Sequence, residues 1–143
     1  MTETHPPTLS TFPVRKAIVI GLALFSFFMS ALVSRTVFEG LPHLEDEVAY
    51  LYGARIFAHG DLVIPSPEPR RAFWQPFVVD YQGTRFSKYT PGWSMQLAIG
   101  ELLGEAWVIN AFMGMLTVVL VYRLGREIFD EDVGVIAAAL TAF

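Results

Sequence analysis

The chain has 143 residues, of which 53% are hydrophobic and only 17% are charged, and its net charge is −4. A soluble domain usually carries about 25% charged residues, so the composition places the chain among membrane proteins. It has no basic patch of the kind that binds nucleic acid, and no cysteine for disulfides or thiolate metal sites. The apolar run that ends at Phe143 supplies about half of a membrane span. We therefore expect the chain to be the N-terminal piece of a larger protein.

The first predicted elements are a tail and a membrane span. Residues 1–13 are polar and rich in proline, which predicts a disordered cytoplasmic tail. Residues 14–34 contain the uncharged run Ala17–Val33 and are predicted to form the first transmembrane helix. Arg15 and Lys16 precede this run and place the N-terminus in the cytoplasm. A signal peptide is the alternative interpretation, but no cleavage site followed by a soluble-looking domain supports it.

The next segment, 35–105, is predicted to be a loop on the outer side that carries interfacial helices. Leu44–His59 has the pattern of a helix. One face of that helix presents four residues at helical spacing: Asp46, Tyr50, Gly53 and Phe57. A glycine in mid-helix costs about 1 kcal/mol relative to alanine, which indicates close packing or ligand approach at Gly53. Further on, Ile64–Pro69 is predicted to be loop, and Phe77–Lys88 is predicted to be a short hairpin.

The last third of the chain predicts two more spans. Residues 106–123 form the second transmembrane helix, 124–132 a cytoplasmic turn, and 133–143 the start of a third span. Pro91–Gly104 is short and is predicted to lie at the membrane interface, because counting it as a span would place the arginines after residue 122 outside. The fold class is therefore all-α and integral to a membrane.

Three consecutive acids begin the predicted outside helix: Glu45, Asp46 and Glu47. Acids in a first helical turn are favoured by the helix dipole, by about 0.3–1 kcal/mol each, and this is a sufficient structural explanation. The functional interpretation is a carboxylate held at the membrane surface as a general base or metal ligand. Whether a divalent metal ion is needed stays open.

A second group, Arg85, Lys88 and Tyr89, precedes the predicted helix start at Pro91. Cations at a membrane interface often only contact lipid head groups. The sharper hypothesis is that Lys88 and Arg85 hold the phosphate of a lipid carrier. Trp74 and Trp93 are typical of interface anchors.

The order of these motifs resembles the first outside loop of GT-C-fold membrane glycosyltransferases. The residues that carry the likeness are Leu44–Tyr50, Ala54–Asp61, Pro65 and Phe86–Trp93, followed by Leu124–Phe129. They are most similar to glycosyltransferase family 39, the group of protein O-mannosyltransferases and lipid A aminoarabinose transferases. The resemblance implies the N-terminal part of a GT-C multi-span fold in the cell's inner or plasma membrane.

The resemblance also implies an activity and its residues. The intact protein would move a sugar from a polyprenyl-phosphate donor to a lipid, glycan or protein acceptor on the outer face, with inversion at the anomeric carbon. Asp46, with Glu47 beside it, would supply the essential carboxylate, and Lys88 would contact the carrier phosphate. The chain departs from the family pattern where Tyr89-Thr90 intervenes before a single proline. The fragment alone is expected to be inactive.

Two other classes of function compete with the transferase. A small membrane adaptor would use the acidic outside loop to bind a partner without catalysis. A transporter fragment would need charges inside the membrane, and Glu101 is the one candidate.

Overall fold

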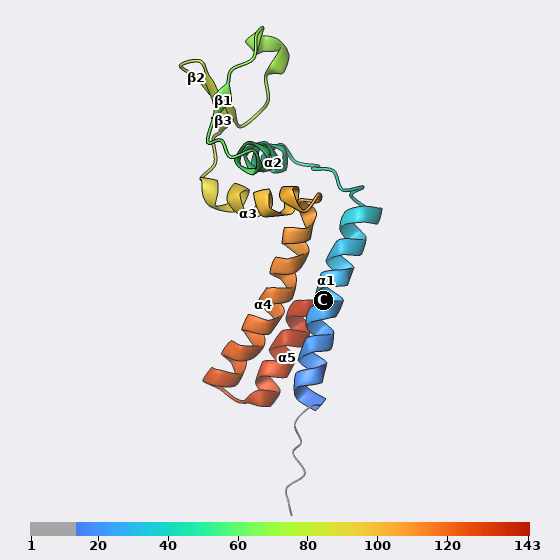
Figure 1. Cartoon of the computed structure of the whole chain (residues 1–143). Coiled ribbons are helices and arrows are strands. Elements are labelled where there is room, and N and C mark those ends of the chain that lie inside the picture. Colours follow the sequence, from blue (N-terminus) through green and yellow to red (C-terminus); the bar gives the residue numbers. More distant parts are fainter. Residues whose placement is uncertain (1–13) are drawn as a thin grey trace, which may run out of the picture. The chain divides into compact units, whose positions relative to one another are not determined.

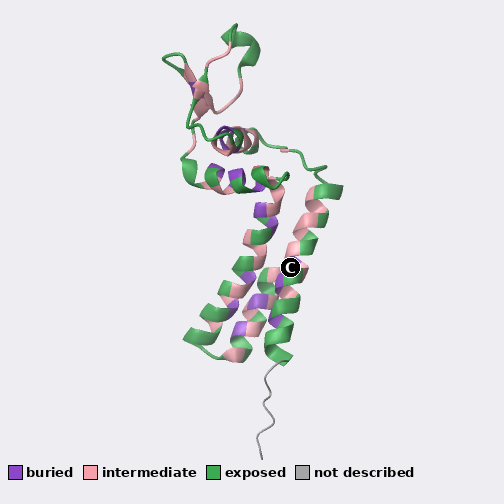
Figure 2. Ribbon diagram, in the orientation of Figure 1, coloured by how far each residue is buried: buried purple, intermediate pink, exposed green. Residues whose placement is uncertain are grey.

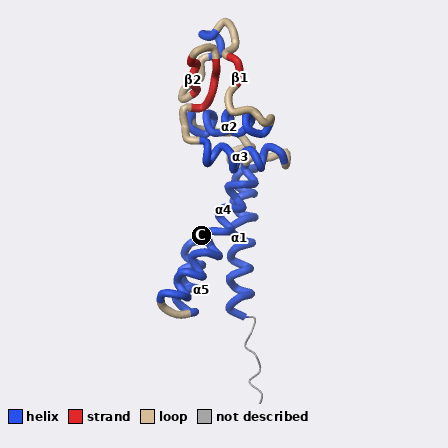
Figure 3. The backbone as a smooth tube through the Cα atoms, turned by 60° about the vertical axis from the view of Figure 1, so that its left-hand side comes forward, coloured by secondary structure: helices blue, strands red, loops and turns tan. Residues whose placement is uncertain are grey.

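The computed structural model describes residues 14–143, so the predicted tail at residues 1–13 lies outside the described residues. The described chain is mostly helical, with a small antiparallel sheet (Figures 1 and 3). It divides into two compact units, residues 14–28 with 114–143 (unit 1) and residues 29–113 (unit 2). The elements in chain order are α1 (Val14–Thr36), α2 (Glu45–Ala58), β1 (Ile64–Pro65), the 3-10 helix η1 (Arg70–Phe73), β2 (Val78–Tyr81), β3 (Thr84–Ser87), α3 (Pro91–Leu102), α4 (Trp107–Ile128) and α5 (Glu131–Ala142).

Within the described residues, α1 and α4 are the helices long and apolar enough to cross a membrane, with 23 and 22 residues. α1 contains the whole uncharged run that the sequence predicts as the first span, and α4 begins at Trp107, one residue after the predicted start of the second. The second helix differs from the prediction at its end, because it continues through Arg123 and Arg126 to Ile128. Arginine, leucine and glutamate are good helix formers, so nothing stops the helix earlier. The predicted turn at 124–132 therefore shrinks to two residues.

The second of those two residues, Asp130, is the N-cap of α5. Its side chain accepts a hydrogen bond from the Val133 backbone N–H at 2.9 Å, which satisfies one of the free donors of the first turn. The helix therefore begins at Glu131, two residues before the predicted start. The prediction placed the start of the third span at the first apolar residue, 133. The helix starts earlier because Asp130 caps it and two acids in the first turn are favoured by the helix dipole.

In unit 1, parts of α1 and α4 pack with α5 around a core of small and medium side chains. The core residues are Val19, Ala23, Val118, Tyr122 and Ala138. Figure 2 shows buried positions on the helices of this unit, between exposed ones. Gly134 lies so close to α4 that an added Cβ would be 2.7 Å from the Tyr122 carbonyl oxygen. Small residues let helix backbones approach in this way, which is typical of helices packed in a membrane.

An ion-pair group closes one end of unit 1. Arg15, in the first turn of α1, lies 3.1 Å from Glu131 and 2.6 Å from Asp132. These acids directly follow the turn after α4, so the start of α1 and the end of α4 lie at the same end of this unit. Solvent screens exposed ion pairs, so this group contributes little to the stability of unit 1.

In unit 2, α2 packs against α3 (Figure 1). α3 begins with Pro91, whose fixed φ suits the first helical turn. The core of the unit is formed by Ala54, Leu97, Ala98 and Ile109. Gly53 lies at the closest approach, where an added Cβ would be 2.8 Å from Ser94 Oγ. The sequence suggests either close packing or the approach of a ligand at Gly53, and the structure supports close packing.

The sheet has the order β1-β3-β2, with β3 antiparallel to both neighbours (Figure 3). The predicted hairpin is confirmed, and both turn residues, Gln82 and Gly83, have positive φ of 47° and 79°. Hairpin turns of this kind match the twist of the strands. The prediction of loop at Ile64–Pro69 is wrong for its first two residues, because Ile64 pairs with Arg85 to form β1. The described chain is therefore mostly helical, which is compatible with the predicted all-α class, and it carries one small sheet.

The contact between Gly53 and Ser94 gives a first prediction. Gly53→Val should destabilise unit 2 by about 1–3 kcal/mol, because the added atoms overpack a closed contact. The measurement is unfolding of the protein in detergent, followed by circular dichroism. Gly21→Val is the matched control, since an added Cβ at Gly21 has no atom within 4 Å. Equal stability of the two variants would contradict the packing argument.

Candidate functional site

Glu47 and Asp46 are neighbours in the first turn of α2, but their carboxylates have different partners. Glu47 Oε2 accepts hydrogen bonds from the backbone N–H groups of His43 at 2.7 Å and Leu44 at 3.3 Å. This is half of a capping box, in which a side chain three residues into the helix satisfies donors before it. The structural explanation for an acid in the first turn therefore fits Glu47 directly.

Asp46 faces the segment that leads into α3. Its Oδ1 accepts a hydrogen bond of 2.6 Å from the Tyr89 hydroxyl. The Tyr89 ring also stacks on Tyr50, one helical turn after Asp46, with ring centroids 4.5 Å apart. Asp46 and Tyr50 thus use the same helix face that the sequence predicts, and Tyr89 lies against it.

Lys88 precedes Tyr89 and is held by aromatic rings. Its ammonium nitrogen lies 3.9 Å from the centroid of the Phe77 ring and 5.2 Å from that of Tyr89. Its backbone N–H donates to the Phe77 carbonyl oxygen at 2.9 Å. Phe77 has a φ of 59°, which is a strained conformation for a bulky residue. Strain of this kind is often found at functional sites.

Tyr89 therefore contacts both predicted charged residues, the acid through its hydroxyl and the lysine through its ring. Asp46 and Lys88 are themselves exposed, so a ligand can reach both. The hydrogen bond to Asp46, followed by burial, raises the pKa of the Tyr89 phenol to about 12. The carboxylate favours the neutral hydroxyl that donates to it, so the contact persists throughout the ordinary pH range.

Arg85 lies apart from Lys88, although the sequence groups the two. Its side chain is buried, donates to the Phe73 carbonyl oxygen and lies 3.6 Å from Asp80. The guanidinium also lies over the Tyr52 ring of α2, at 5.6 Å. Burial raises the pKa of Tyr52. In this conformation Arg85 joins β3 to the loop around η1 and to α2, while Lys88 alone faces solvent.

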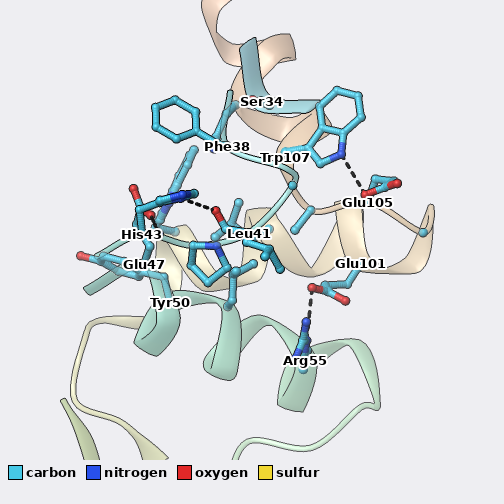
Figure 4. A pocket seen from close by; sticks show the side chains of 18 residues that line it. Ser34, Phe38, Leu41, His43, Glu47, Tyr50, Arg55, Glu101, Glu105 and Trp107 are labelled. Atoms are coloured by element: carbon cyan, nitrogen blue, oxygen red, sulfur yellow. Dashed lines mark hydrogen bonds and ion pairs between the residues drawn. The ribbon is translucent and has the colours of Figure 1, made fainter. Parts of the chain in front are cut away.

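A pocket of about 370 Å³ opens beside this group, within unit 2 (Figure 4). It is lined by the end of α1, the loop before α2, one face each of α2 and α3, and the start of α4. The lining includes Glu47 and Tyr50, so the pocket borders the Asp46–Tyr89 contact through Tyr50. Volumes of 300–1,000 Å³ are usual for small-molecule sites.

Metal ligation has less support in the same region. Among residues 14–143, no group of three or more histidine and acidic side chains could hold a metal ion. His43 Nδ1 lies 2.9 Å from the Leu41 carbonyl oxygen, and His59 Nδ1 lies 2.8 Å from that of Arg55. The structure thus does not bring the two histidines together.

Sequence reasoning named Tyr50 and Tyr89 but gave no part in the site to Phe77 or Trp107. Phe77 contacts Lys88 and Trp107 lines the pocket, yet aromatic residues are common in cores and carry no spacing signal of their own. The signal for Tyr50 was its place four residues after Asp46, on one helix face. Phe77 could not be found, because its position depends on a strained backbone conformation. Glu101, the one candidate for a charge inside the membrane, pairs with Arg55 at 3.5 Å.

The Tyr89 contact predicts a late-titrating tyrosine. Ultraviolet titration should show one tyrosinate component with a pKa of about 12 that disappears in Tyr89→Phe. In Asp46→Asn the component should move toward the ordinary tyrosine value of about 10, because the neighbouring charge is gone. The stability from this contact is complete below about pH 10 and is lost as the pH rises through about 12.

Tyr81→Phe is the control for this titration, since Tyr81 lies on the exposed side of the hairpin, away from Asp46. The late component should stay in that variant. A titration that is the same in Tyr89→Phe and in the unsubstituted protein would show that the contact does not form in solution.

Comparison of the chain with known proteins adds no relative. No protein-family model, curated protein or solved structure matches it. Its function has to be inferred from the residues and the geometry described above.

Proposed function

We propose that the chain is part of a membrane glycosyltransferase that moves a sugar from a polyprenyl-phosphate donor to an acceptor on the outer face of the membrane. One observation carries the proposal. Tyr89 brings an exposed carboxylate, Asp46, and an exposed ammonium group, Lys88, to one small region of unit 2. The transfer needs both charges: one for the acceptor proton and one for the leaving phosphate.

In the proposed reaction, Asp46 takes the proton of the acceptor hydroxyl as that oxygen bonds to the anomeric carbon. The bond between the anomeric carbon and the phosphate oxygen breaks, and polyprenyl phosphate leaves with the electron pair. A well-placed base typically contributes about 10²–10⁴-fold to the rate. Tyr89 orients the carboxylate through its 2.6 Å hydrogen bond.

Lys88 is proposed to stabilise the charge that grows on the leaving phosphate. The aromatic rings attract the ammonium group and restrict its position. Arg85 was expected to share this role, but its guanidinium already contacts Phe73 and Asp80. We therefore assign the phosphate to Lys88 and a positioning role to Arg85.

The proposed membrane topology follows from the two apolar helices and the charges at their ends. α1 and α4 are each long enough to span, and α4 ends with Arg123 and Arg126. In unit 1 this end lies beside Arg15, which pairs with the acids of α5. Cationic ends on one side favour the cytoplasm for that side, and hence for the N-terminus.

The function is tested by transfer from a labelled polyprenyl-phosphate sugar in membranes that contain the intact transferase of which the chain is proposed to be part, with each substitution made in that protein. Asp46→Asn is expected to lower the transfer rate by about 10²–10⁴-fold. Lys88→Ala should lower it by about 10²–10³-fold, as for the loss of other groups that stabilise a transition-state charge. Arg71→Ala, a change of an exposed loop cation, is the control and should transfer normally.

Loss of transfer in Lys88→Ala with unchanged transfer in Asp46→Asn would refute the base assignment. No transfer in any preparation, together with recovery of a specific binding partner through the acidic loop, would favour the adaptor instead.

Cysteine labelling tests the topology, and the chain has no cysteine to interfere. Gln82→Cys, at the turn of the hairpin, should react with a membrane-impermeant maleimide in intact cells. Phe129→Cys, which is exposed between α4 and α5, should react only after lysis. The opposite pattern would place the candidate site in the cytoplasm and contradict the proposal.

A further inference from the structure

The pocket of unit 2 lies next to the proposed base, Asp46, but its lining differs in charge from the region around Lys88. Tyr50 lines the pocket and also stacks on Tyr89, whose hydroxyl holds Asp46. Lys88, the proposed phosphate contact, is not among the lining residues. The site is thus divided into a cationic part and an adjoining pocket, with Tyr50 and Tyr89 between them.

Flat aromatic rings form much of the pocket wall. Phe38, Tyr50, Trp93 and Trp107 all line it (Figure 4). Trp107 is held in place, because its indole N–H donates to Glu105 Oε2 at 2.8 Å and Arg35 lies over its ring at 5.3 Å. Aromatic walls with a few fixed polar groups suit a ligand that has an apolar face and a polar edge.

The charged groups of the lining are mostly acidic. Three carboxylates, those of Glu47, Glu101 and Glu105, line the pocket together with one cation, Arg55. Arg55 pairs with Glu101 at 3.5 Å, and Arg35, outside the lining, pairs with Glu105 at 3.3 Å, so the carboxylates still outnumber the cations that pair with them. Carboxylates accept hydrogen bonds and donate none, so they favour hydroxyl or amine groups on a ligand. They disfavour phosphate or carboxylate groups, because like charges repel at close range.

His43 adds another acceptor. Its Nδ1 lies 2.9 Å from the Leu41 carbonyl oxygen, and a carbonyl only accepts, so Nδ1 carries the proton. In the neutral ring Nε2 is then an acceptor. The pocket therefore offers acceptors from both the loop before α2 and the helices, against few donors.

We propose that this pocket binds the acceptor of the transfer reaction, and that the acceptor is a saccharide without a negative charge at the bound ring. The donor is a poor occupant, because its phosphate is bonded directly to its sugar and would bring an anion into a lining whose carboxylates outnumber the arginines that pair with them. The acceptor role rests on the proposed function. The binding of a neutral or amine-bearing saccharide can be measured without it.

Tryptophan fluorescence provides the test. The chain has three tryptophans, and two of them, Trp93 and Trp107, line the pocket. In Trp74→Phe the remaining fluorescence therefore comes from the pocket. The protein in detergent is titrated with methyl glucoside, glucosamine and glucose 1-phosphate, which share one ring and differ in charge.

The first two sugars should give a saturable change, and glucose 1-phosphate should bind about tenfold more weakly or not at all. Glu101→Gln should narrow this difference, because it removes one of the repelling charges. Trp107→Leu, made in the Trp74→Phe protein, should weaken the binding of the neutral sugar by about tenfold. The fluorescence of Trp93 still reports the binding in this variant. Circular dichroism of each variant distinguishes lost binding from lost folding.

Three results would overturn the inference: no saturable change with any sugar, equal or tighter binding of glucose 1-phosphate, or displacement of the sugar by a polyprenyl phosphate added to the detergent. The last would assign the pocket to the donor. Sugar binding without transfer by the intact transferase would refute the proposed function and leave a saccharide site, whereas transfer without sugar binding would refute only the assignment of the pocket.

Discussion

The close approach of α2 and α3 is the constraint on which the rest of unit 2 depends. Gly53 permits it, because any side chain at that position would meet Ser94. Ser94 in turn donates to the Tyr50 carbonyl oxygen at 3.0 Å, which joins the two helices one turn before the glycine. With α3 fixed in this way, the residue two before its first turn, Tyr89, comes to lie against Tyr50 and Asp46. The geometry of the candidate site therefore depends on the absence of a side chain at Gly53, which lies seven residues after Asp46 in α2.

The two acids at the start of α2 show how one sequence feature can serve two purposes. Glu47 satisfies backbone donors at the helix start, and this role accounts for its position without any function. Asp46 is not needed there, and its carboxylate meets Tyr89 instead. The general rule that acids stabilise a first helical turn explains why both residues are tolerated. Only the direction of each side chain separates the structural acid from the candidate catalytic one.

Much of the secondary structure could be predicted from the sequence, and the reasons are local. The uncharged run before Ser34, the helix with Asp46 and Tyr50 on one face, and the hairpin turn at Gly83 all depend on neighbours within a few residues. The errors occurred where contacts with residues farther along the chain determine the structure. Ile64 is in a strand because it pairs with β3. Arg85 is buried because its side chain contacts Asp80 and the Phe73 carbonyl oxygen. The family resemblance and the activity that it implies stay predictions, since the geometry is compatible with them but is not specific to them.

Charge separates the two parts of the proposed site. The cationic part has one exposed lysine whose ammonium group is flanked by aromatic rings. The pocket has three carboxylates, of which two pair with arginines and one, Glu47, has no cationic partner among residues 14–143. A donor that carries a phosphate and an acceptor that carries hydroxyl groups would each be favoured in one part and disfavoured in the other. Such a division would prevent the donor from occupying the place of the acceptor, which a transferase with two sugar-bearing substrates has to avoid. Tyr50 and Tyr89 form the boundary, and they also hold Asp46 there, where the proposed reaction would need a base for the proton of the acceptor.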